Sequence, residues 1–470
     1  MSIIATILPE IFLSISIMIL LILGVFAKES FNIVYKSSIV ILVFIVLLLA
    51  NNFENFFQIF NESYVIDSLS NYIKILSIIS AIVVLLISYE YVNSLKLNKF
   101  EYPILIMSSL LGAMIMISAN DLIVFYMGLE LQSLPLYVLA SIDRENERST
   151  EAGLKYFVLS ALSSGLLLYG CSLIYGFTGS TNFQSIAENF NSESFGLIFG
   201  IVFIIVGLGF KISAVPFHMW TPDVYEGSPT SVTIFFALVP KIAAMTVFIR
   251  FTNVAFSNIF DQWQLILIFL SVGSMILGAV AAIGQENIKR LMAYSSIGHM
   301  GYALAGILTG TIEGIKSTII YLTIYAVMNA GMFACIFFMK KKNKYVENIK
   351  DLSGLSKTNP LLAVGFLIML FSLAGIPPLA GFFAKFYIFV AVVNSKLYLL
   401  AVIGLITTVI SAFYYLRIVK IIYFDESKIP FQNVKSYPLK FILLTSSLII
   451  LLYFVYPSIL IDMTSSISLG

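Results

Sequence analysis

The sequence predicts an all-α protein that crosses a membrane about fourteen times. Of its 470 residues, 59% are hydrophobic and only 11% are charged, and the mean hydropathy is +0.98. So few charges cannot cover the surface of a water-soluble domain. The net charge of +2 is close to zero and gives no indication of nucleic-acid binding. We therefore interpret the chain as a single membrane domain that extends over residues 1–470.

A transmembrane helix needs roughly 20 apolar residues, and about fourteen windows of the sequence meet this requirement. The first window begins near Ile3 and is too long for the core of a signal peptide, so we expect it to be retained as a span. The predicted spans cover approximately residues 3–26, 31–50, 67–92, 101–119, 121–142, 151–176, 196–216, 229–251, 262–284, 288–308, 314–339, 358–394, 396–423 and 438–461.

Two of these spans contain features that interrupt a helix. The twelfth window, 358–394, is longer than one straight span requires and contains Gly375-Ile376-Pro377-Pro378 near its middle. Two successive prolines remove backbone donors and clash with the preceding turn, which predicts two half-helices joined by an unwound segment. In the seventh window Pro216 follows Lys211 closely, and we expect a similar break there.

The distribution of basic residues predicts the orientation of the chain. Loops on the inner side of a membrane are enriched in lysine and arginine. If the N-terminus lies outside, most of the 27 lysines and arginines fall in inner loops. The outer side then holds only Lys74, Arg250, Lys316 and Lys396. We therefore expect both termini on the outer side.

The candidate functional residues are titratable groups inside apolar spans. Lys211, Lys241 and Lys385 lie in GLGFKISAVPF, FFALVPKIAAM and LAGFFAKFYIF, and Glu130 lies in FYMGLELQSLPL. A charge at the centre of a membrane costs roughly 2.5–3.5 kcal/mol or more, so such residues usually serve function. With a rise of about 1.5 Å per residue, these four residues and His299 all fall near the midplane. Groups at one depth on separate helices predict a lateral path for protons.

Each candidate also has a plain structural interpretation. Glu130 could pair with a neighbouring helix for packing alone, the lysines could extend toward the interface, and His299 is equally consistent with a core histidine. Other charged residues lie near span ends and are interpreted as interfacial: Glu10, Asp67, Lys74, Glu90, Asp121 and Glu286.

The sequence contains no motif for a cofactor or a metal. Cys171 and Cys335 both lie in apolar segments, without a CxxC spacing or a cysteine–histidine cluster. We therefore expect no redox centre, cofactor site or metal site in this chain. A weak internal repeat is also visible, because Ala119-Asn120-Asp121 and Gln285-Glu286-Asn287 each precede a span with a central polar residue.

Four runs of sequence carry a resemblance to a known family: FYMGLELQSLPLYVLAS, GLGFKISAVPFHMWTPDVYEGSPTSVTIFFA, QENIKRLMAYSSIGHMGYALAG and SLAGIPPLAGFFAKFYIF. They resemble the antiporter-like membrane subunits of bacterial proton-pumping NADH:quinone oxidoreductase, respiratory complex I. The run PFHMWTPDVYEGSPT favours the subunit N branch over the L and M branches. These subunits are in turn similar to Mrp-type cation/proton antiporters.

The resemblance implies a fold of fourteen helices with two inverted five-helix repeats and broken seventh and twelfth helices. The repeats would cover roughly residues 101–251 and 262–423, after N-terminal helices at 1–100 and before a C-terminal helix at 438–461.

The resemblance also implies residue roles and partners. The family's essential glutamate matches Glu130, its three intramembrane lysines match Lys211, Lys241 and Lys385, and His299 falls on its tenth-helix polar position. NADH, FMN, iron–sulfur clusters and quinone would be bound by partner subunits of a hetero-oligomer. The expected location is the bacterial inner membrane, with both termini on the periplasmic side.

Functions of other classes remain open at this point. A stand-alone Mrp-type antiporter that moves sodium or protons would use the same charges. A structural scaffold would not need lysines at the midplane. A carrier for an organic solute would need a substrate-specific set of residues, which the sequence does not show.

Overall fold

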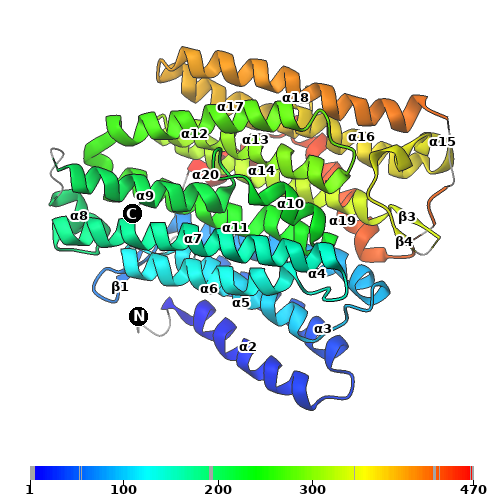
Figure 1. Cartoon of the computed structure of the whole chain (residues 1–470), viewed down its shortest axis with the longest axis horizontal. Coiled ribbons are helices and arrows are strands. Elements are labelled where there is room, and N and C mark those ends of the chain that lie inside the picture. The colour runs from blue at the N-terminus through cyan, green and yellow to red at the C-terminus, as the bar shows by residue number, and fades with distance from the viewer. Residues whose placement is uncertain are drawn as a thin grey trace. The chain divides into compact units, whose positions relative to one another are not determined.

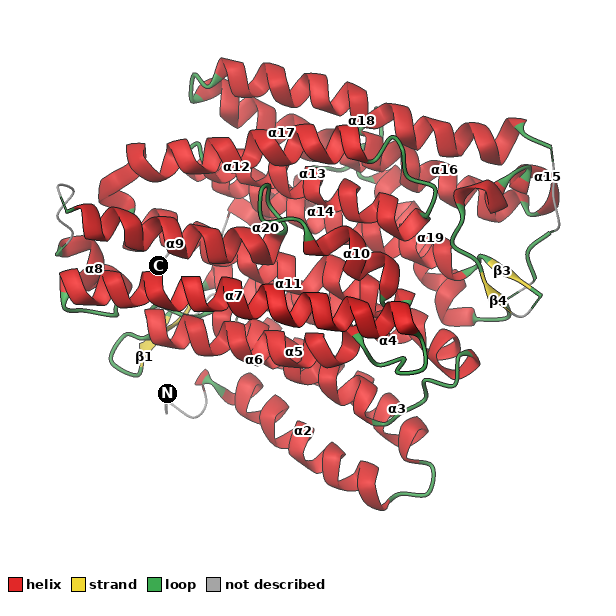
Figure 2. Ribbon diagram, viewed as in Figure 1, coloured by secondary structure: helices red, strands yellow, loops and turns green. Residues whose placement is uncertain are grey.

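The chain folds almost entirely into helices. The computed structural model describes residues 6–51, 53, 56–189, 194–342, 344–426, 430–432, 434–465 and 467. In this part of the chain, the only strands form two short antiparallel hairpins, β1–β2 and β3–β4 (Figure 2). The all-α prediction is therefore confirmed.

The described residues form two compact units. The first contains the residues up to Ile212 and Gly227–Ile266, and the second contains Ser213–Glu226 and Leu267–Ser465. The elements of unit 1 are α2 (Leu8–Phe26), α3 (Ser30–Ala50), β1 (Phe57–Ile59), β2 (Tyr64–Ile66), α4 (Ser68–Ser94), α5 (Glu101–Ile117), α6 (Leu122–Ala140), α7 (Glu147–Thr178), α8 (Phe183–Glu188), α9 (Phe195–Ile212) and α11 (Thr230–Arg250). The π-helical turn Phe251–Ala255 and the 3-10 turn Ser257–Ile259 follow α11.

Unit 2 is also helical. Nearly all of α10 (Trp220–Gly227) and most of α12 (Phe260–Ala281) belong to it. Its other elements are α13 (Ile288–Ile307), α14 (Ile312–Phe337), β3 (Lys340–Lys341), β4 (Lys344–Tyr345), the 3-10 turn Ile349–Leu352, α15 (Leu355–Thr358), α16 (Pro360–Ala374), α17 (Ala380–Asn394), α18 (Tyr398–Phe424), α19 (Tyr437–Leu452) and α20 (Ser458–Ser465).

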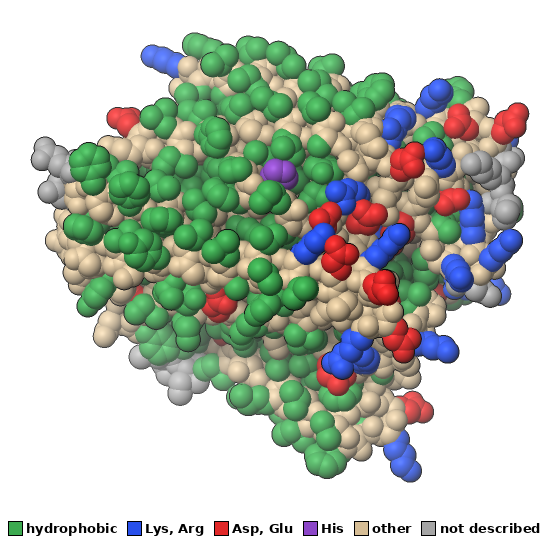
Figure 3. All heavy atoms as spheres, viewed as in Figure 1, with side chains coloured by type: hydrophobic (Ala, Val, Ile, Leu, Met, Phe, Trp, Pro, Cys, Tyr) green, Lys and Arg blue, Asp and Glu red, His purple; other side chains and the backbone are tan. Residues whose placement is uncertain are grey.

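The helices have the length and composition of membrane spans. Among the described residues, ten helical segments are long and apolar enough to cross a membrane, and α5, α16, α17 and α19 are shorter apolar helices. Every predicted window contains a helix, and the window 358–394 contains two. Large apolar side chains face outward, such as Met18 and Leu154, which are 65% and 64% exposed. Figure 3 shows hydrophobic side chains over most of the visible face, with charged side chains gathered in its right-hand part, where α10, α15 and the β3–β4 hairpin lie.

Both predicted helix breaks are present. Helix α16 ends at Ala374, Gly375 follows with a φ of 86°, and α17 begins at Ala380. A positive φ is readily adopted by glycine and ends a helix in the left-handed conformation. Helix α9 ends at Ile212, and α10 begins at Trp220. The prolines that predicted these breaks lie in the two interruptions.

Similar backbone bridges occur at the start of one long helix in each unit. In unit 1, Leu122 N donates to Thr181 O and Phe183 N donates to Asn120 O. In unit 2, Ile288 N donates to Glu347 O and Ile349 N donates to Glu286 O. Each bridge ties the start of a helix, α6 or α13, to a second short helix farther along the chain. Asp121 and Asn287 cap the two long helices at equivalent positions, so Asp121 has a structural role at a helix N-terminus.

Helix α6, which carries Glu130, packs closely against α5 in unit 1 (Figure 1). The approach depends on glycine, because a Cβ on Gly112 would lie 2.2 Å from the backbone nitrogen of Gln132. A Cβ on Gly128 would lie 2.8 Å from Met116 N. Small residues allow membrane helices to approach at backbone distance. These glycines therefore fix the position of the segment that contains Glu130.

We expect Gly112→Ala to destabilise the protein, because the added methyl group would overlap backbone atoms of α6. Overpacking of this kind costs roughly 1–3 kcal/mol. The control is Gly165→Ala on α7, where a Cβ would meet no atom within 4 Å. Thermal unfolding in detergent should show a lower midpoint for Gly112→Ala and an unchanged or higher midpoint for Gly165→Ala. Equal midpoints for both variants would contradict this account of the α5–α6 contact.

Candidate functional site

Lys211 lies in the last turn of α9 and is 4% exposed. Its Nζ donates to Ser133 Oγ of α6 at 2.7 Å and to Ser160 Oγ of α7 at 2.8 Å. Buried amines need such partners, because an unsatisfied charge in an apolar interior is very costly. Two hydroxyls from two neighbouring helices therefore hold the Lys211 amine inside unit 1, away from the interface.

Ser160 also connects Lys211 to an aromatic residue. The hydroxyl of Tyr137 donates to Ser160 Oγ at 2.6 Å. The Tyr137 ring also lies close to the amine, with 5.9 Å between its centroid and Lys211 Nζ. Tyr137 lies one turn beyond Ser133 on α6, so both residues face the same side of the helix. The amine thus lies in a polar pocket made by α6 and α7.

Glu130 lies on the same helix, one turn before Ser133. Ser164 Oγ donates a hydrogen bond to the Glu130 carboxylate, and Ser164 follows Ser160 by one turn on α7. Among the residues that the structure describes, no ion pair joins Glu130 to Lys211. The acid and the amine are instead held by successive serines of α7. The structure therefore brings Glu130 and Lys211 to one polar seam without a direct contact between them. The seam consists of these two residues and the hydroxyl-bearing residues Ser133, Tyr137, Ser160 and Ser164.

Lys241 lies in a helix without a lipid-facing side. All 21 residues of α11 are buried, and Lys241 is 0% exposed. A lysine that extended to the interface would be partly exposed. The interfacial interpretation of Lys241 is therefore wrong, and the residue is a buried polar group in unit 1.

Lys385 in unit 2 depends on the break between α16 and α17. Its Nζ donates to the carbonyl oxygens of Leu373 and Ala374 at 3.2 and 3.1 Å. The last carbonyls of a helix have no partner within the helix and form the negative end of its dipole. The break thus supplies the acceptors that hold a buried lysine, which is 5% exposed.

His299 of α13 is bound by tyrosines. Its Nδ1 forms a 2.6 Å hydrogen bond with Tyr321 Oη, and its Nε2 lies 3.4 Å from Tyr415 Oη. Tyr302 links this cluster to Lys385, because its ring lies 6.3 Å from the His299 ring and 5.0 Å from Lys385 Nζ. The structure therefore brings His299 and Lys385 to one aromatic cluster in unit 2.

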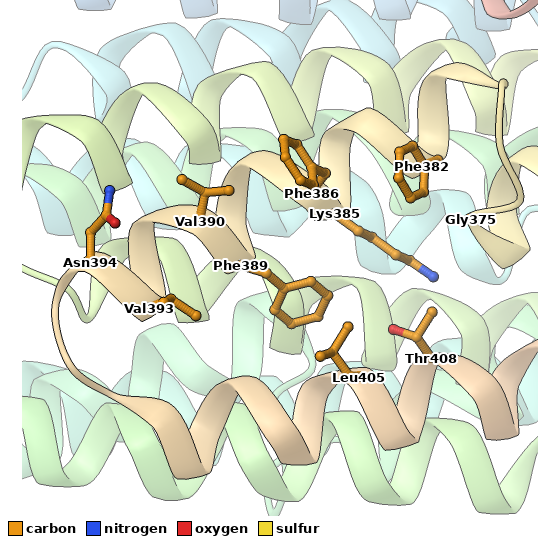
Figure 4. A pocket seen from close by; sticks show the side chains of 10 residues that line it. All are labelled: Gly375, Phe382, Lys385, Phe386, Phe389, Val390, Val393, Asn394, Leu405 and Thr408. Carbon is orange, nitrogen blue, oxygen red and sulfur yellow. The ribbon is translucent and has the colours of Figure 1, made fainter.

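A cavity of about 450 Å³ lies beside Lys385. Figure 4 shows its walls, with side chains of α17 on one side and Leu405 and Thr408 of α18 on the other. Most of the lining is apolar, including Phe382, Phe386 and Phe389. Polar groups are contributed by Lys385, Thr408 and Asn394.

The structure corrects the interfacial interpretation of several charged residues in unit 1. Lys74 is 1% exposed, and its Nζ lies 2.7 Å from Glu10 Oε1 and 3.1 Å from Tyr64 Oη. Arg250 forms a 2.7 Å ion pair with Asp67, and both are buried. Burial opposes ionisation of Asp67, but Arg250 holds the pKa of this carboxyl below its ordinary value. The spacing along one span could not show these pairs, because their partners come from other helices.

Charges at the ends of unit 2 helices are paired as well. Arg290 Nη1 donates to Asp223 at 2.7 Å and to Glu226 at 3.1 Å. Lys350 Nζ donates to Glu286 at 2.8 Å, and this contact lowers the pKa of Glu286. Glu286 is 63% exposed at its side chain, so its interfacial interpretation agrees with the structure.

Comparison with known proteins identifies the family. Residues 119–411 match the transmembrane family described as NADH:quinone oxidoreductase/Mrp antiporter. The chain belongs to this family. It is 61% identical over 464 residues to NADH-quinone oxidoreductase subunit N of Pelagibacter ubique, with 98% of each chain covered. It is 52% identical to the protein of the same name from Parvibaculum lavamentivorans, with 97% of this chain and 95% of that protein covered.

Solved structures of the NADH:quinone oxidoreductase/Mrp antiporter family share the fold. A chain of respiratory complex I from Thermus thermophilus aligns with a TM-score of 0.84 and 29% identity, covering 98% of this chain and 100% of that chain. A chain of the Mrp complex from a Dietzia species aligns with a TM-score of 0.86, covering 99% and 97% of the two chains. The sequence identity to that chain is 20%, so this comparison shows only that the two chains share a fold.

The sequence did not identify four residues of the polar seam, and all four carry a hydroxyl group. Ser133, Ser160, Ser164 and Tyr137 surround Glu130 and Lys211, yet serine is common in apolar helices and does not attract notice there. A usable pattern was present, because Ser160 and Ser164 are spaced by four residues, as are Ser133 and Tyr137. That spacing places each pair on one helix face. In the described residues, no group of three potential metal ligands occurs.

We expect Lys74→Ala to destabilise the protein strongly, because it leaves Glu10 buried without its cation. Removing one partner of a buried ion pair costs roughly 3–5 kcal/mol. The control is Lys155→Ala, which removes a partly exposed i,i+4 pair with Glu151 worth roughly 0.3–0.5 kcal/mol. Thermal unfolding in detergent measures both. A Lys74→Ala protein as stable as Lys155→Ala would show that the pair contributes little.

Proposed function

We propose that this chain is the N-type antiporter-like membrane subunit of a proton-pumping NADH:quinone oxidoreductase. The observation that carries the proposal is the 61% identity, over 98% of both chains, to a relative named subunit N. Electron transfer from NADH to quinone, with FMN and iron–sulfur clusters, takes place in partner subunits. This chain contributes proton translocation across the bacterial inner membrane, with both termini on the periplasmic side.

The buried groups are suited to moving protons. Burial favours the neutral forms of an acid and an amine, whereas an opposite charge nearby favours their ionised forms. Glu130 and Lys211 lie on one polar seam and are separated by serine hydroxyls. Because an opposite charge stabilises the ionised amine, a change in the distance between the two groups alters the affinity of Lys211 for its proton. Lys241, His299 and Lys385 provide the further titratable groups of the path. We assign the direction of transfer from Glu130 and Lys211 toward Lys385.

The matching bridges at α6 and α13 support two structural repeats, which we place at roughly 101–251 and 262–423. Repeats of five helices each would have opposite orientation in the membrane, which is a frequent transporter architecture. Each would then contain one broken helix, α9–α10 or α16–α17.

A second candidate is a stand-alone cation/proton antiporter of the Mrp type. The Mrp complex shares the fold, but the relatives of high identity are named subunit N. The two functions differ in their ion. Proton pumping by membrane vesicles that persists after sodium is replaced by choline supports the first function, and a strict requirement for sodium supports the second.

We expect Glu130→Gln and Lys211→Ala to abolish NADH-driven proton pumping and to reduce quinone reduction strongly, while the complex still assembles. Each change removes a titratable group from the seam. The measurement is the quenching of a pH-sensitive dye in inverted membrane vesicles, and Lys155→Ala serves as the exposed-lysine control. Normal pumping by either seam variant means that the seam is not the proton path.

We expect Lys385→Arg to impair pumping nearly as much as Lys385→Ala. Arginine keeps the charge beside the carbonyls of Leu373 and Ala374, but it stays protonated at any accessible pH. A group that releases its proton in each cycle cannot be replaced by arginine, whereas a group that supplies only charge can. Pumping at the parental rate by Lys385→Arg would identify Lys385 as an electrostatic element.

A further inference from the structure

An open groove lies on the surface of unit 1, where α6 packs against both α5 and α7 (Figure 1). Its volume is about 600 Å³. Gly153 of α7 lines the groove beside Ser141, which follows the end of α6. A Cβ on Gly153 would lie 2.5 Å from the Cβ of Ser141. This close contact between α7 and the end of α6 closes the groove on the protein side.

Most of the groove wall is apolar and faces away from the protein. Val138, Leu154 and Phe157 are 50%, 64% and 49% exposed, and Leu105 of α5 also lines the groove. Along α7 the lining extends from Thr150 to Phe157. With a rise of 1.5 Å per residue this is about 10 Å, or about a third of a ~30 Å hydrocarbon layer. The wall therefore suits the part of an acyl chain that lies nearest to a lipid headgroup.

One end of the groove carries charges of both signs. Lys99, Glu101 and Arg144 belong to the lining and are exposed. Among the residues that the structure describes, none of these three side chains takes part in an ion pair. Basic pockets between membrane helices bind lipid headgroups, and cations form strong hydrogen bonds with phosphate. The groove thus combines two cations and one carboxylate with an apolar wall.

We propose that this groove binds a phosphatidylethanolamine molecule of the surrounding membrane. The phosphate lies between Lys99 and Arg144, and the headgroup ammonium donates to Glu101. The acyl chains follow the apolar wall toward Phe157. This zwitterionic headgroup matches all three charges, whereas a lipid with a net negative charge would place part of that charge beside Glu101. The inference concerns the outer surface of unit 1 and does not depend on proton transfer by this chain.

The first test uses a phosphatidylethanolamine that carries a diazirine on one acyl chain, added to the assembled complex in detergent. After illumination, we expect labelled peptides from residues 99–157 of this chain. Unlabelled phosphatidylethanolamine should compete strongly. Phosphatidylcholine, which has the same net charge but no N–H group, should compete weakly, as should the anionic phosphatidylglycerol. Competition by either lipid at least as strong as that of phosphatidylethanolamine overturns the assignment of the headgroup.

The second test removes the charges of the groove one at a time. Arg144→Gln is compared with Arg148→Gln, because both arginines are exposed and only Arg144 belongs to the lining. We expect the probe concentration for half-maximal labelling to rise about fivefold in Arg144→Gln and to stay at the parental value in Arg148→Gln. Glu101→Gln should remove the preference for phosphatidylethanolamine over phosphatidylcholine. Glu147→Gln, an exposed position outside the lining, should keep that preference.

The third test fills the apolar part of the groove. Leu154 and Leu162 are 64% and 63% exposed on α7, and only Leu154 lines the groove. We expect Leu154→Trp to abolish labelling of this region and Leu162→Trp to leave it unchanged. All the substituted residues are exposed, so a loss of labelling is not a folding defect. Equal labelling of the two tryptophan variants overturns the proposal. Absence of labelling in the parental complex also overturns it and indicates that a partner subunit covers the groove.

Discussion

The cost of a charge in an apolar interior is the constraint on which the rest of this structure depends. Lys211, Lys241 and Lys385 are each no more than 5% exposed, so each amine must find partners within the protein. For Lys211 and Lys385 the partners differ in kind. Lys211 is held by side-chain hydroxyls from two helices, whereas Lys385 is held by backbone carbonyls that a broken helix leaves unpaired.

These two solutions have different consequences for proton transfer. Hydroxyl groups both donate and accept, so Ser160 and Tyr137 can pass a proton by reorienting. Carbonyl oxygens only accept, so Leu373 and Ala374 stabilise the charge of Lys385 without conducting its proton. If Lys385 releases a proton, as the proposed function requires, that proton must use another neighbour. Thr408 in the cavity lining carries such a group, and its hydroxyl donates to Tyr302 Oη at 3.1 Å.

The sequence predicted the helical fold, the two breaks and the burial of the candidate lysines. These features are local, because an apolar window or a proline pair acts on its own segment. It did not predict the partners. The ion pairs Glu10–Lys74 and Asp67–Arg250 join residues far apart in the chain, and a single span seen alone makes each of these residues look interfacial. The serines around Lys211 were missed for the same reason, since their role comes from helix packing.

Two glycines at the contact between α5 and α6 determine where the polar residues of α6 lie. Glu130 and Ser133 lie on α6, and α6 reaches its position only because Gly112 and Gly128 permit backbone contact with α5. A displacement of α6 by one methyl group would move the acid, the serine and Tyr137 together relative to α7 and α9. Hydrogen bonds near 2.7 Å do not tolerate such a shift. The position of the polar seam in unit 1 therefore depends on glycines, which have no side chain, as much as on the charged residues Glu130 and Lys211.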